Sequence, residues 1–133
     1  MIHSALVVLL AKLSGSTDVV IGAPVAGRGE RALDDLIGMF VNTVALRTQL
    51  DPRTTVAGLL RDTGRRDKRA LAHADVPFDQ VVDALGRTRS SSYTPLFQVM
   101  FTYQNMPPSV VTLPGLEVRA LDLGLSEAKF DLH

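Results

Sequence analysis

The chain has 133 residues, enough for one domain that buries about two-thirds of its unfolded surface. Fourteen Lys and Arg residues balance fourteen Asp and Glu, so no net charge draws the chain to nucleic acid or to an anionic membrane. The absence of Cys excludes disulfides, thiolate catalysis and cysteine-based zinc sites, and it suits a cytoplasmic protein. Because 46% of the residues are hydrophobic, we expect some apolar surface to contact another segment or partner.

The first 50 residues predict a helix, a short strand, a loop and a longer strand. The first helix ends at Gly15, which takes a left-handed conformation, and it is too short to span a membrane. Its helically spaced apolar residues predict the buried face: Ile2, Ala5, Leu6, Leu9, Leu10 and Leu13. A buried strand over 18–22 ends at Pro24, and residues 26–32 form a polar loop. A helical turn over 33–37 stops at Gly38, and residues 41–50 alternate as a second strand.

The remainder predicts two helices and further strands. Thr54 or Thr55 caps a long helix. The side of this helix that is expected to face inward is apolar except for the charged residue Asp67. Pro77 breaks it, and a helix over 78–85 turns Val81, Val82 and Leu85 inward. A loop over 86–94 precedes strands over 96–103, 116–121 and 129–132. This alternation predicts an α/β fold, a layered mixed sheet with flanking helices. Since the chain ends within an apparent strand, we expect a truncation there.

Two groups of residues could carry chemistry but have simpler explanations. The loop from Gly22 to Gly29 spaces glycines as a phosphate-binding loop does, but it has Arg28 and Gly29 where that loop needs Lys and Ser or Thr. His73 and Asp75, with Asp79 nearby, could form a metal pair or an acid–base dyad. We favour the alternative that Asp75 caps the helix beginning near residue 78, while His73 stabilises the end of the preceding helix.

Two further features have open alternatives. The long helix is basic, and its arginines are either a solvated face or candidate contacts for an acidic carrier protein: Arg61, Arg65, Arg66 and Arg69. Asn42 lies in an otherwise apolar strand, where it either closes a local hydrogen-bond gap or faces a wet channel. If it is buried without partners, it costs about 1–3 kcal/mol.

Three motifs in order resemble the condensation domain of nonribosomal peptide synthetases. Residues 18–28 are similar to a strand and loop ending in Ile-Gly-x-Pro-x-Ala-Gly-Arg. Residues 37–47 meet every defined position of Ile-Gly-x-Phe-Val-Asn-Thr-x-x-x-Arg, and residues 73–79 are similar to His-Gln-Asp-Val-Pro-Phe-Glu. Residues 96–101 and 128–132 also resemble the family, whereas its last motif is reduced to Arg87, Pro95 and Leu96. The family's catalytic His-His-x-x-x-Asp-Gly run is absent from the 133 residues.

The resemblance implies that residues 1–133 are part of the C-terminal lobe of a chloramphenicol-acetyltransferase-like fold with a tunnel between two lobes. Complete domains of the family join aminoacyl or peptidyl thioesters by amide formation. The resemblance implies no directly bound cofactor, because the substrates arrive on phosphopantetheine arms of carrier proteins. It also implies partners: the N-terminal lobe, carrier proteins and an adenylation domain. Residues expected to shape the lobe and the tunnel wall are Arg28, Gly38, Asn42, Thr43, Arg47, His73, Asp75, Pro77 and Phe78.

Three hypotheses follow for this chain. It is a part of a condensation domain that is not catalytic alone, because general-base catalysis needs a titratable group within reach of the attacking amine. Alternatively, it is a non-catalytic module that binds carrier proteins or complements a separate lobe. In the third hypothesis it is a product with little stable core, which hydrogen exchange would reveal.

Overall fold

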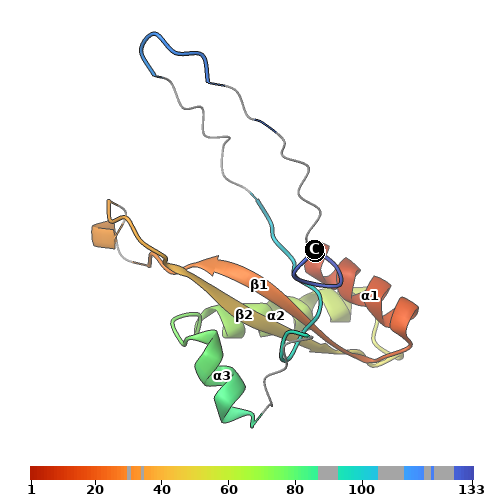
Figure 1. Ribbon diagram of the computed structural model, residues 1–133. Coiled ribbons are helices and arrows are strands. Elements are labelled where there is room, and N and C mark those ends of the chain that lie inside the picture. Colours follow the sequence, from red (N-terminus) through yellow and green to blue (C-terminus); the bar gives the residue numbers. More distant parts are fainter. Residues whose placement is uncertain (30, 34, 87–92, 105–112, 119–120, 122–127) are drawn as a thin grey trace.

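The helices and strands of the described residues lie in the first two-thirds of the chain (Figure 1). The computed structural model describes residues 1–29, 31–33, 35–86, 93–104, 113–118, 121 and 128–133. The elements, in order, are helix α1 (Ile2–Ser14), strand β1 (Asp18–Ala26), the 3₁₀ turn η1 (Arg31–Leu33), strand β2 (Val41–Gln49), helix α2 (Val56–Leu71) and helix α3 (Phe78–Ala84). Within this described part, no helix combines the length and the apolar character that crossing a membrane requires.

Strands β1 and β2 form an antiparallel hairpin that separates two layers of packing. Asp18 pairs with Gln49 at one end and Ala26 with Val41 at the other. Because paired residues point to the same side of a sheet and alternate along it, Val19 and Ile21 share the face of Leu46 and Thr48. Gly22, Ala45 and Arg47 lie on the opposite face. The hairpin register therefore decides which side chains meet which helix.

Helices α1 and α2 cover the first face, behind the hairpin in Figure 1. Val7 of α1 is fully buried against Val19 and Ile21. The predicted inward face of α1 is wrong in part, because Ile2, Leu9 and Leu13 are exposed whereas His3, Ser4 and Val7 are buried. Apolar residues surround most of this helix, so their spacing does not choose a face. The choice comes from packing against both β1 and α2.

The second face carries α3 and the segment around Phe97. Gly22 lies directly beneath this ring, and a Cβ atom added to it would lie 2.3 Å from Phe97 Cε2. Phe97 is 2% exposed, and its ring centroid lies 5.4 Å from that of Phe78 and 5.8 Å from that of Phe130. Val82 of α3 is also buried, as predicted, but Leu85 is exposed because α3 ends at Ala84. The missing side chain at Gly22 thus makes room for an aromatic cluster.

Strand β1 continues through Pro24 to Ala26, which corrects the predicted end of the strand. The Gly22 N–H points away from β2, because it donates to the Val99 carbonyl at 2.9 Å. Alternate residues of a strand direct their N–H groups to the same side, so the N–H that Pro24 lacks would also point away from β2. The pairing of Pro24 with Thr43 therefore loses no hydrogen bond on the β2 side.

The predicted later strands reduce to isolated bridges. Met100 pairs with Gly22, and Val99 pairs with Leu132, both in parallel orientation. Leu96 has φ 73°, a left-handed conformation that no regular strand contains, so pairing begins only beyond it. Leu116 bridges back to Leu113 around a turn instead of beginning a strand. Part of the predicted strand over 116–121, most of the loop over 86–94 and the motif residue Arg87 lie outside the described residues.

Local predictions at the helix ends are confirmed. Gly15 ends α1 with φ 70°, and the Thr55 side chain caps α2 by accepting a hydrogen bond from the Gly58 N–H. The helical turn predicted over 33–37 is described only in part: η1 ends at Leu33, and the Leu36 N–H donates to the Leu33 carbonyl at 3.2 Å in one further turn. Capping groups act within a few residues of one another, so these helix ends follow from the local sequence.

Candidate functional site

Asn42 joins two motif segments that are more than 30 residues apart. Its Nδ2 donates to the carbonyl oxygens of Ala74 at 2.8 Å and Val76 at 2.7 Å. Its Oδ1 accepts from the Phe78 N–H at 3.2 Å. Every polar atom of the amide is therefore used across the corner between α2 and α3. Of the two alternatives left open by the sequence, the structure favours the one in which Asn42 satisfies backbone hydrogen-bonding groups. These groups belong to residues 74–78, which are distant in sequence, and not to neighbours of Asn42.

The same contact corrects the predicted role of Asp75. Helix α3 begins after Pro77, and no side chain of its own segment caps it. Asp75 is exposed, and the Phe78 N–H is satisfied by Asn42 from another element. His73 follows the end of α2 as predicted, with its N–H donated to the Ala70 carbonyl. In the part of the chain that is described, no three His, Asp or Glu side chains are gathered as a metal site would need.

Arg28 and Phe40 organise the tip of the β1–β2 hairpin. The Arg28 guanidinium donates to the carbonyls of Leu33 and Leu36 and lies 4.2 Å from the centre of the Phe40 ring. The Phe40 carbonyl accepts from the Gly27 N–H at 2.8 Å. Gly38 does not have a positive φ, and a Cβ atom there would lie 3.2 Å from Phe40 Cε2. Its role is close approach to this ring, not a left-handed turn.

Arg47 forms a forked ion pair with Asp18 across the hairpin. Nε lies 2.9 Å from Oδ1, and Nη2 lies 2.6 Å from Oδ2. The hydrogen bonds from Arg47 hold the pKa of the Asp18 carboxyl below its usual range, and Asp18 raises the pKa of Arg47 in return. Both side chains are substantially exposed, so solvent weakens the pair. It holds the Arg47 guanidinium beside Asp18 of β1, on the face of the hairpin opposite Leu46 and Thr48.

The arginines of α2 divide into two groups. Arg65 pairs with Asp62 at 3.0 Å, and Arg61 lies outside the described cavities. A cavity of about 360 Å³ lies between α2 and β2. Its lining includes Arg47, Arg66, Asp67, Arg69 and His73.

The inward position of the charged residue Asp67 is explained by a partner. Its Oδ2 lies 2.9 Å from Nδ1 of the buried His3 in α1. Helical spacing identified Asp67 as an odd residue within the inward stripe. It gave no indication of the partner, since His3 is 64 residues away in sequence.

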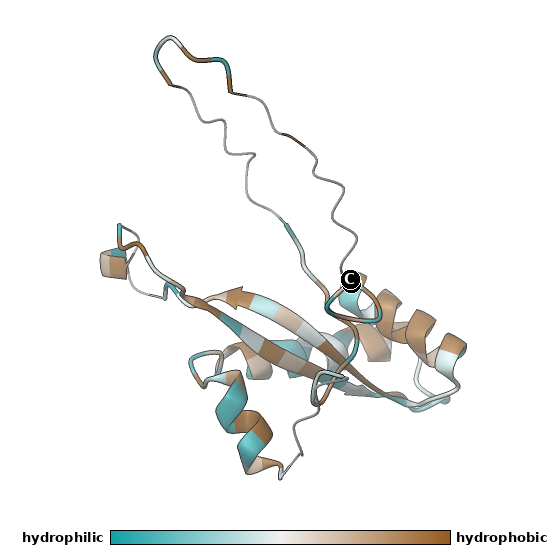
Figure 2. Ribbon diagram, viewed as in Figure 1, coloured by the Kyte–Doolittle hydropathy of each residue, from teal (hydrophilic) through white to brown (hydrophobic). Residues whose placement is uncertain are grey.

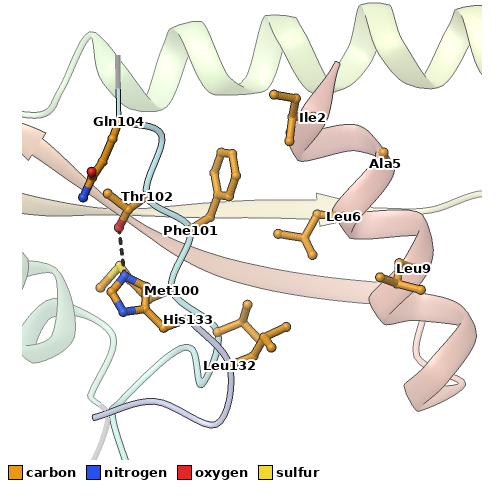
Figure 3. A pocket seen from close by; sticks show the side chains of 11 residues that line it. Ile2, Ala5, Leu6, Leu9, Met100, Phe101, Thr102, Gln104, Leu132 and His133 are labelled. Carbon is orange, nitrogen blue, oxygen red and sulfur yellow. Dashed lines mark hydrogen bonds between the residues drawn. The ribbon is translucent and has the colours of Figure 1, made fainter. Parts of the chain in front are cut away.

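A second cavity, of about 660 Å³, is apolar and lies beside α1 (Figure 3). Ile2, Leu6 and Leu9 face it from the helix, and Phe101 and Leu132 face it from the extended segments. The hydrophobic colour extends around much of α1 in Figure 2. Thr102 Oγ1 lies 3.0 Å from Nε2 of His133 at its rim. An apolar surface of this kind agrees with the expectation that the chain contacts another segment.

The predicted site residues therefore occupy separate regions. Asn42, Pro77 and Phe78 meet at one corner, Arg47 and His73 line the basic cavity, and Arg28 and Gly38 lie at the hairpin tip. Thr43 is half-buried, but its side chain makes no hydrogen bond within the described residues. The cluster of Phe97 on Gly22 was missed, and the only signal for it was a glycine inside a predicted strand.

Comparison with known proteins identifies the family. A family model described as the condensation domain matches residues 1–133. Malpinin synthetase from Mortierella alpina is 48% identical over 131 residues, which are 98% of this chain and 2% of that protein. A dimodular nonribosomal peptide synthase from Bacillus subtilis is 38% identical over 131 residues, 98% of this chain and 6% of that protein.

Solved structures give the same result. A four-domain nonribosomal peptide synthetase bound to AMP and glycine matches with a TM-score of 0.75 and 35% identity, over 77% of this chain and 8% of that one. The condensation domain of the monacolin K polyketide synthase matches with a TM-score of 0.65 and 31% identity, over 73% of this chain and 23% of that one. The chain thus spans a small part of its relatives, and the α/β architecture is that of the chloramphenicol-acetyltransferase-like fold. The chain belongs to the condensation-domain family of nonribosomal peptide synthetases.

Proposed function

We propose that residues 1–133 form part of the C-terminal lobe of a condensation domain in nonribosomal peptide synthesis. The complete domain would join two carrier-bound aminoacyl or peptidyl thioesters. In that reaction the acceptor amine attacks the donor thioester, a C–N bond forms, and the C–S bond breaks to release the donor arm as a thiol. The family match over the whole chain supports this proposal, as do relatives that are peptide synthetases. We expect it to operate in the cytoplasm, with an adenylation domain loading amino acids onto the carrier proteins.

The observation that carries the proposal is the contact of Asn42 with the corner before α3. It holds the motif segment 37–47 against the motif segment 73–79 through three hydrogen bonds. These hydrogen bonds fix the position of β2 relative to α2 and α3, and they offer no reactive group. Asn42, Pro77 and Phe78 therefore act in this proposal as parts of a wall. Arg28, Gly38, Thr43, Arg47, His73 and Asp75 would shape the same lobe.

Among the described residues, no histidine is placed to serve as a general base for the acceptor amine. His3 is buried and occupied by Asp67, while His133 Nε2 lies 3.0 Å from Thr102 Oγ1. His73 is exposed beside arginines, with no carboxylate hydrogen-bonded to its ring among the described residues. A base needs both reach and an orienting partner. We therefore propose that catalysis requires the remainder of the domain.

The test is reconstitution with loaded carriers. The chain is assayed alone and together with the N-terminal part of a condensation domain, and the amide product is measured by mass spectrometry. We expect product only from the combination. Amide formation by the chain alone would contradict its proposed non-catalytic role. Failure of the chain to restore activity, while an intact domain is active with the same carriers, would contradict its role as a lobe.

A second candidate function is binding of carrier proteins without catalysis. The supporting observation is that Arg61, Arg66 and Arg69 are exposed on α2 and form no ion pair in the described part of the structure. An acidic carrier would associate through complementary charge, which raises the association rate and is screened by salt. Titration of a loaded carrier at low and high salt tests this function. Absence of binding at low salt would exclude it.

A further inference from the structure

The outer side of β2 is an open backbone edge among the described residues. The Gly22 N–H donates to the Val99 carbonyl, and the Gly22 carbonyl accepts from the Phe101 N–H, so both backbone groups of this β1 residue point away from β2. Ala45 is paired with Gly22, and the two residues of such an antiparallel pair direct their backbone groups away from each other. The N–H and C=O groups of Ala45, and of Arg47 two residues later, therefore point away from β1. Within the described part of the chain, they form no backbone hydrogen bond.

Two cavities meet along this edge, one on each face of the hairpin. The basic cavity between α2 and β2 has a volume of about 360 Å³. The other, named here the α3 cavity, has a volume of about 600 Å³ and lies on the face that carries α3. Ala45 and Arg47 border both cavities. Because their side chains lie on the α3 face, the basic cavity meets these two residues at their backbone.

The basic cavity has a surplus of positive charge. Arg66 and Arg69 line it from α2 and form no ion pair among the described residues. The carboxylate in its lining is that of Asp67, whose Oδ2 is held 2.9 Å from Nδ1 of His3. Two guanidinium groups thus face one engaged carboxylate, so this cavity suits an acidic side chain.

The α3 cavity is mostly apolar. Its charged lining residues, Arg47 and Asp18, neutralise each other at 2.6 Å. The other side chains that line it are apolar: Val20, Ala45, Val81, Leu85 and Leu96. This cavity therefore suits an apolar side chain.

We propose that the outer edge of β2 binds an extended peptide strand whose side chains alternate between acidic and apolar. Such a strand would exchange backbone hydrogen bonds with Ala45 and Arg47, which supply affinity. Paired residues of neighbouring strands share a face, so the residue opposite Ala45 points into the α3 cavity. Its two neighbours point to the other face, into the basic cavity. The two cavities thus select the side chains of a strand that the edge holds by its backbone.

A second copy of the chain is a poorer occupant of this edge than an acidic peptide. Strand β2 contains no Asp or Glu, so β2 of another copy would bring no carboxylate to the basic cavity. Binding at the edge also goes beyond the proposed function, because strand addition involves no reacting group. A failed amide-formation assay would leave this surface intact.

The first experiment titrates the ¹⁵N-labelled chain with the peptide acetyl-Glu-Val-Glu-Val-Glu-amide. We expect saturable binding with a dissociation constant on the order of 0.1–1 mM, because few hydrogen bonds form at an exposed edge. In the free chain the amides of Val44 and Leu46, which face β1, should exchange slowly, and those of Ala45 and Arg47 rapidly. Saturating peptide should slow exchange at Ala45 and Arg47 at least about fivefold. Shifts that do not saturate, or protection without this alternation, would overturn the proposal.

Methylated peptides separate backbone pairing from side-chain attraction. One peptide is N-methylated on its valine amides and another on its glutamate amides, so both keep the same side chains. Only one of these sets of amides faces β2 in an added strand. One peptide should therefore bind at least about tenfold more weakly, and the other should stay within about twofold of the parent. Loss with methylated valines indicates an antiparallel strand, loss with methylated glutamates a parallel one, and equal affinities would exclude strand addition.

A proline at the edge tests the same backbone contact from the side of the chain. Ala45→Pro removes an outward N–H and leaves the bonds between β1 and β2, as Pro24 does in β1. It should weaken binding at least about fivefold while the Leu46 amide stays protected. Unchanged affinity in the folded variant would contradict the proposal, and the methylated peptides decide the question if this variant does not fold.

Paired substitutions in α2 test the choice of an acidic side chain. Arg66→Gln/Arg69→Gln should weaken binding of the glutamate peptide by about three- to tenfold. The matched control Arg61→Gln/Arg65→Gln removes the same charge from residues that do not line the basic cavity, and it should change affinity less than about twofold. An equal loss in both variants would contradict the selection of an acidic side chain.

Sedimentation of the free chain tests the other occupant. We expect no dimer in which the Ala45 and Arg47 amides are protected before peptide is added. A dimer with that protection would show that a second copy takes the edge, and the proposal of a peptide partner would be wrong.

Discussion

Replacement of Asn42 by Ala tests the hydrogen bonds that join the motif segments 37–47 and 73–79. The change removes two donated hydrogen bonds and leaves the Phe78 N–H without its acceptor. The contacts to Ala74 and Phe78 are partly buried, whereas the contact to Val76 is exposed and contributes less. A buried hydrogen bond contributes about 1 kcal/mol, and loss of a helix cap costs a similar amount. We therefore expect the free energy of unfolding to fall by about 2–3 kcal/mol.

Urea denaturation followed by circular dichroism measures this loss. With an m-value of about 1.5–2 kcal/mol per molar, typical of a small domain, the midpoint should fall by roughly 1–2 M. Hydrogen exchange of the Phe78 amide gives a local readout, because this N–H loses its acceptor. An unchanged midpoint together with unchanged Phe78 protection would refute the reasoning.

Two further substitutions, one at residue 43 and one at residue 42, serve as controls. Thr43→Ala changes the next residue of β2, whose side chain makes no hydrogen bond in the described structure, so the Phe78 amide should stay protected. Asn42→Asp keeps an acceptor for Phe78 but places a carboxylate against two carbonyl oxygens. It should destabilise the corner at neutral pH, and less so in acid, where the carboxyl is protonated.

Three further outcomes are expected. Gly22→Ala should lower the free energy of unfolding by about 1–3 kcal/mol, because its Cβ would lie 2.3 Å from the Phe97 ring. Asp67→Ala should cost about 1–3 kcal/mol, measured by urea denaturation, because it leaves the buried His3 Nδ1 without a partner. The pKa of Asp18 is lowered in the folded state, so its contribution is present above the ordinary carboxyl pKa of about 3.9 and is lost as pH falls below it. Asp18→Asn should therefore reduce the loss of stability in acid.

Each of these outcomes has a matched control. Gly64→Ala meets no atom within 4 Å and should stabilise α2 by about 0.5–1 kcal/mol, and destabilisation as large as that of Gly22→Ala would contradict the steric argument. Asp62→Ala removes an exposed ion pair and should cost less than about 1 kcal/mol, so an effect equal to that of Asp67→Ala would count against the buried pair. The difference made by Asp18→Asn should shrink in 1 M salt, which screens exposed charges.

The ends of the helices could be predicted because their causes are local. Gly15 and Thr55 act on backbone groups within the adjacent turn, and both took the expected roles. The continuation of β1 through Pro24 could not be predicted in this way, because it depends on which side of the strand carries the missing N–H. The cap of α3 also escaped local reasoning, since the acceptor for Phe78 comes from Asn42 in β2.

The candidate site was predicted as a set of residues but not as an arrangement. The motif pattern identified Asn42, Arg47 and the segment 73–79, and the family assignment is confirmed. The sequence did not indicate that Asn42 joins two of these segments, nor that Arg66 and Arg69 separate from Arg61 and Arg65. These divisions depend on how α2 is rotated against β2, and a basic stripe alone does not specify that rotation.

The sequence by itself determined the family, the order of the helices and strands from α1 to α3, and the roles of Gly15 and Thr55 at helix ends, because periodicity, capping and motif spacing are properties of neighbouring residues. Tertiary structure decided which polar residues are partners. Asn42 finds the corner at residues 74–78, and His3 finds Asp67, because folding brings distant segments into contact and buried polar atoms take the partners they meet there. It also decided that Gly22 holds space for Phe97. A glycine in a strand predicts close approach, and only the packed layers show what approaches.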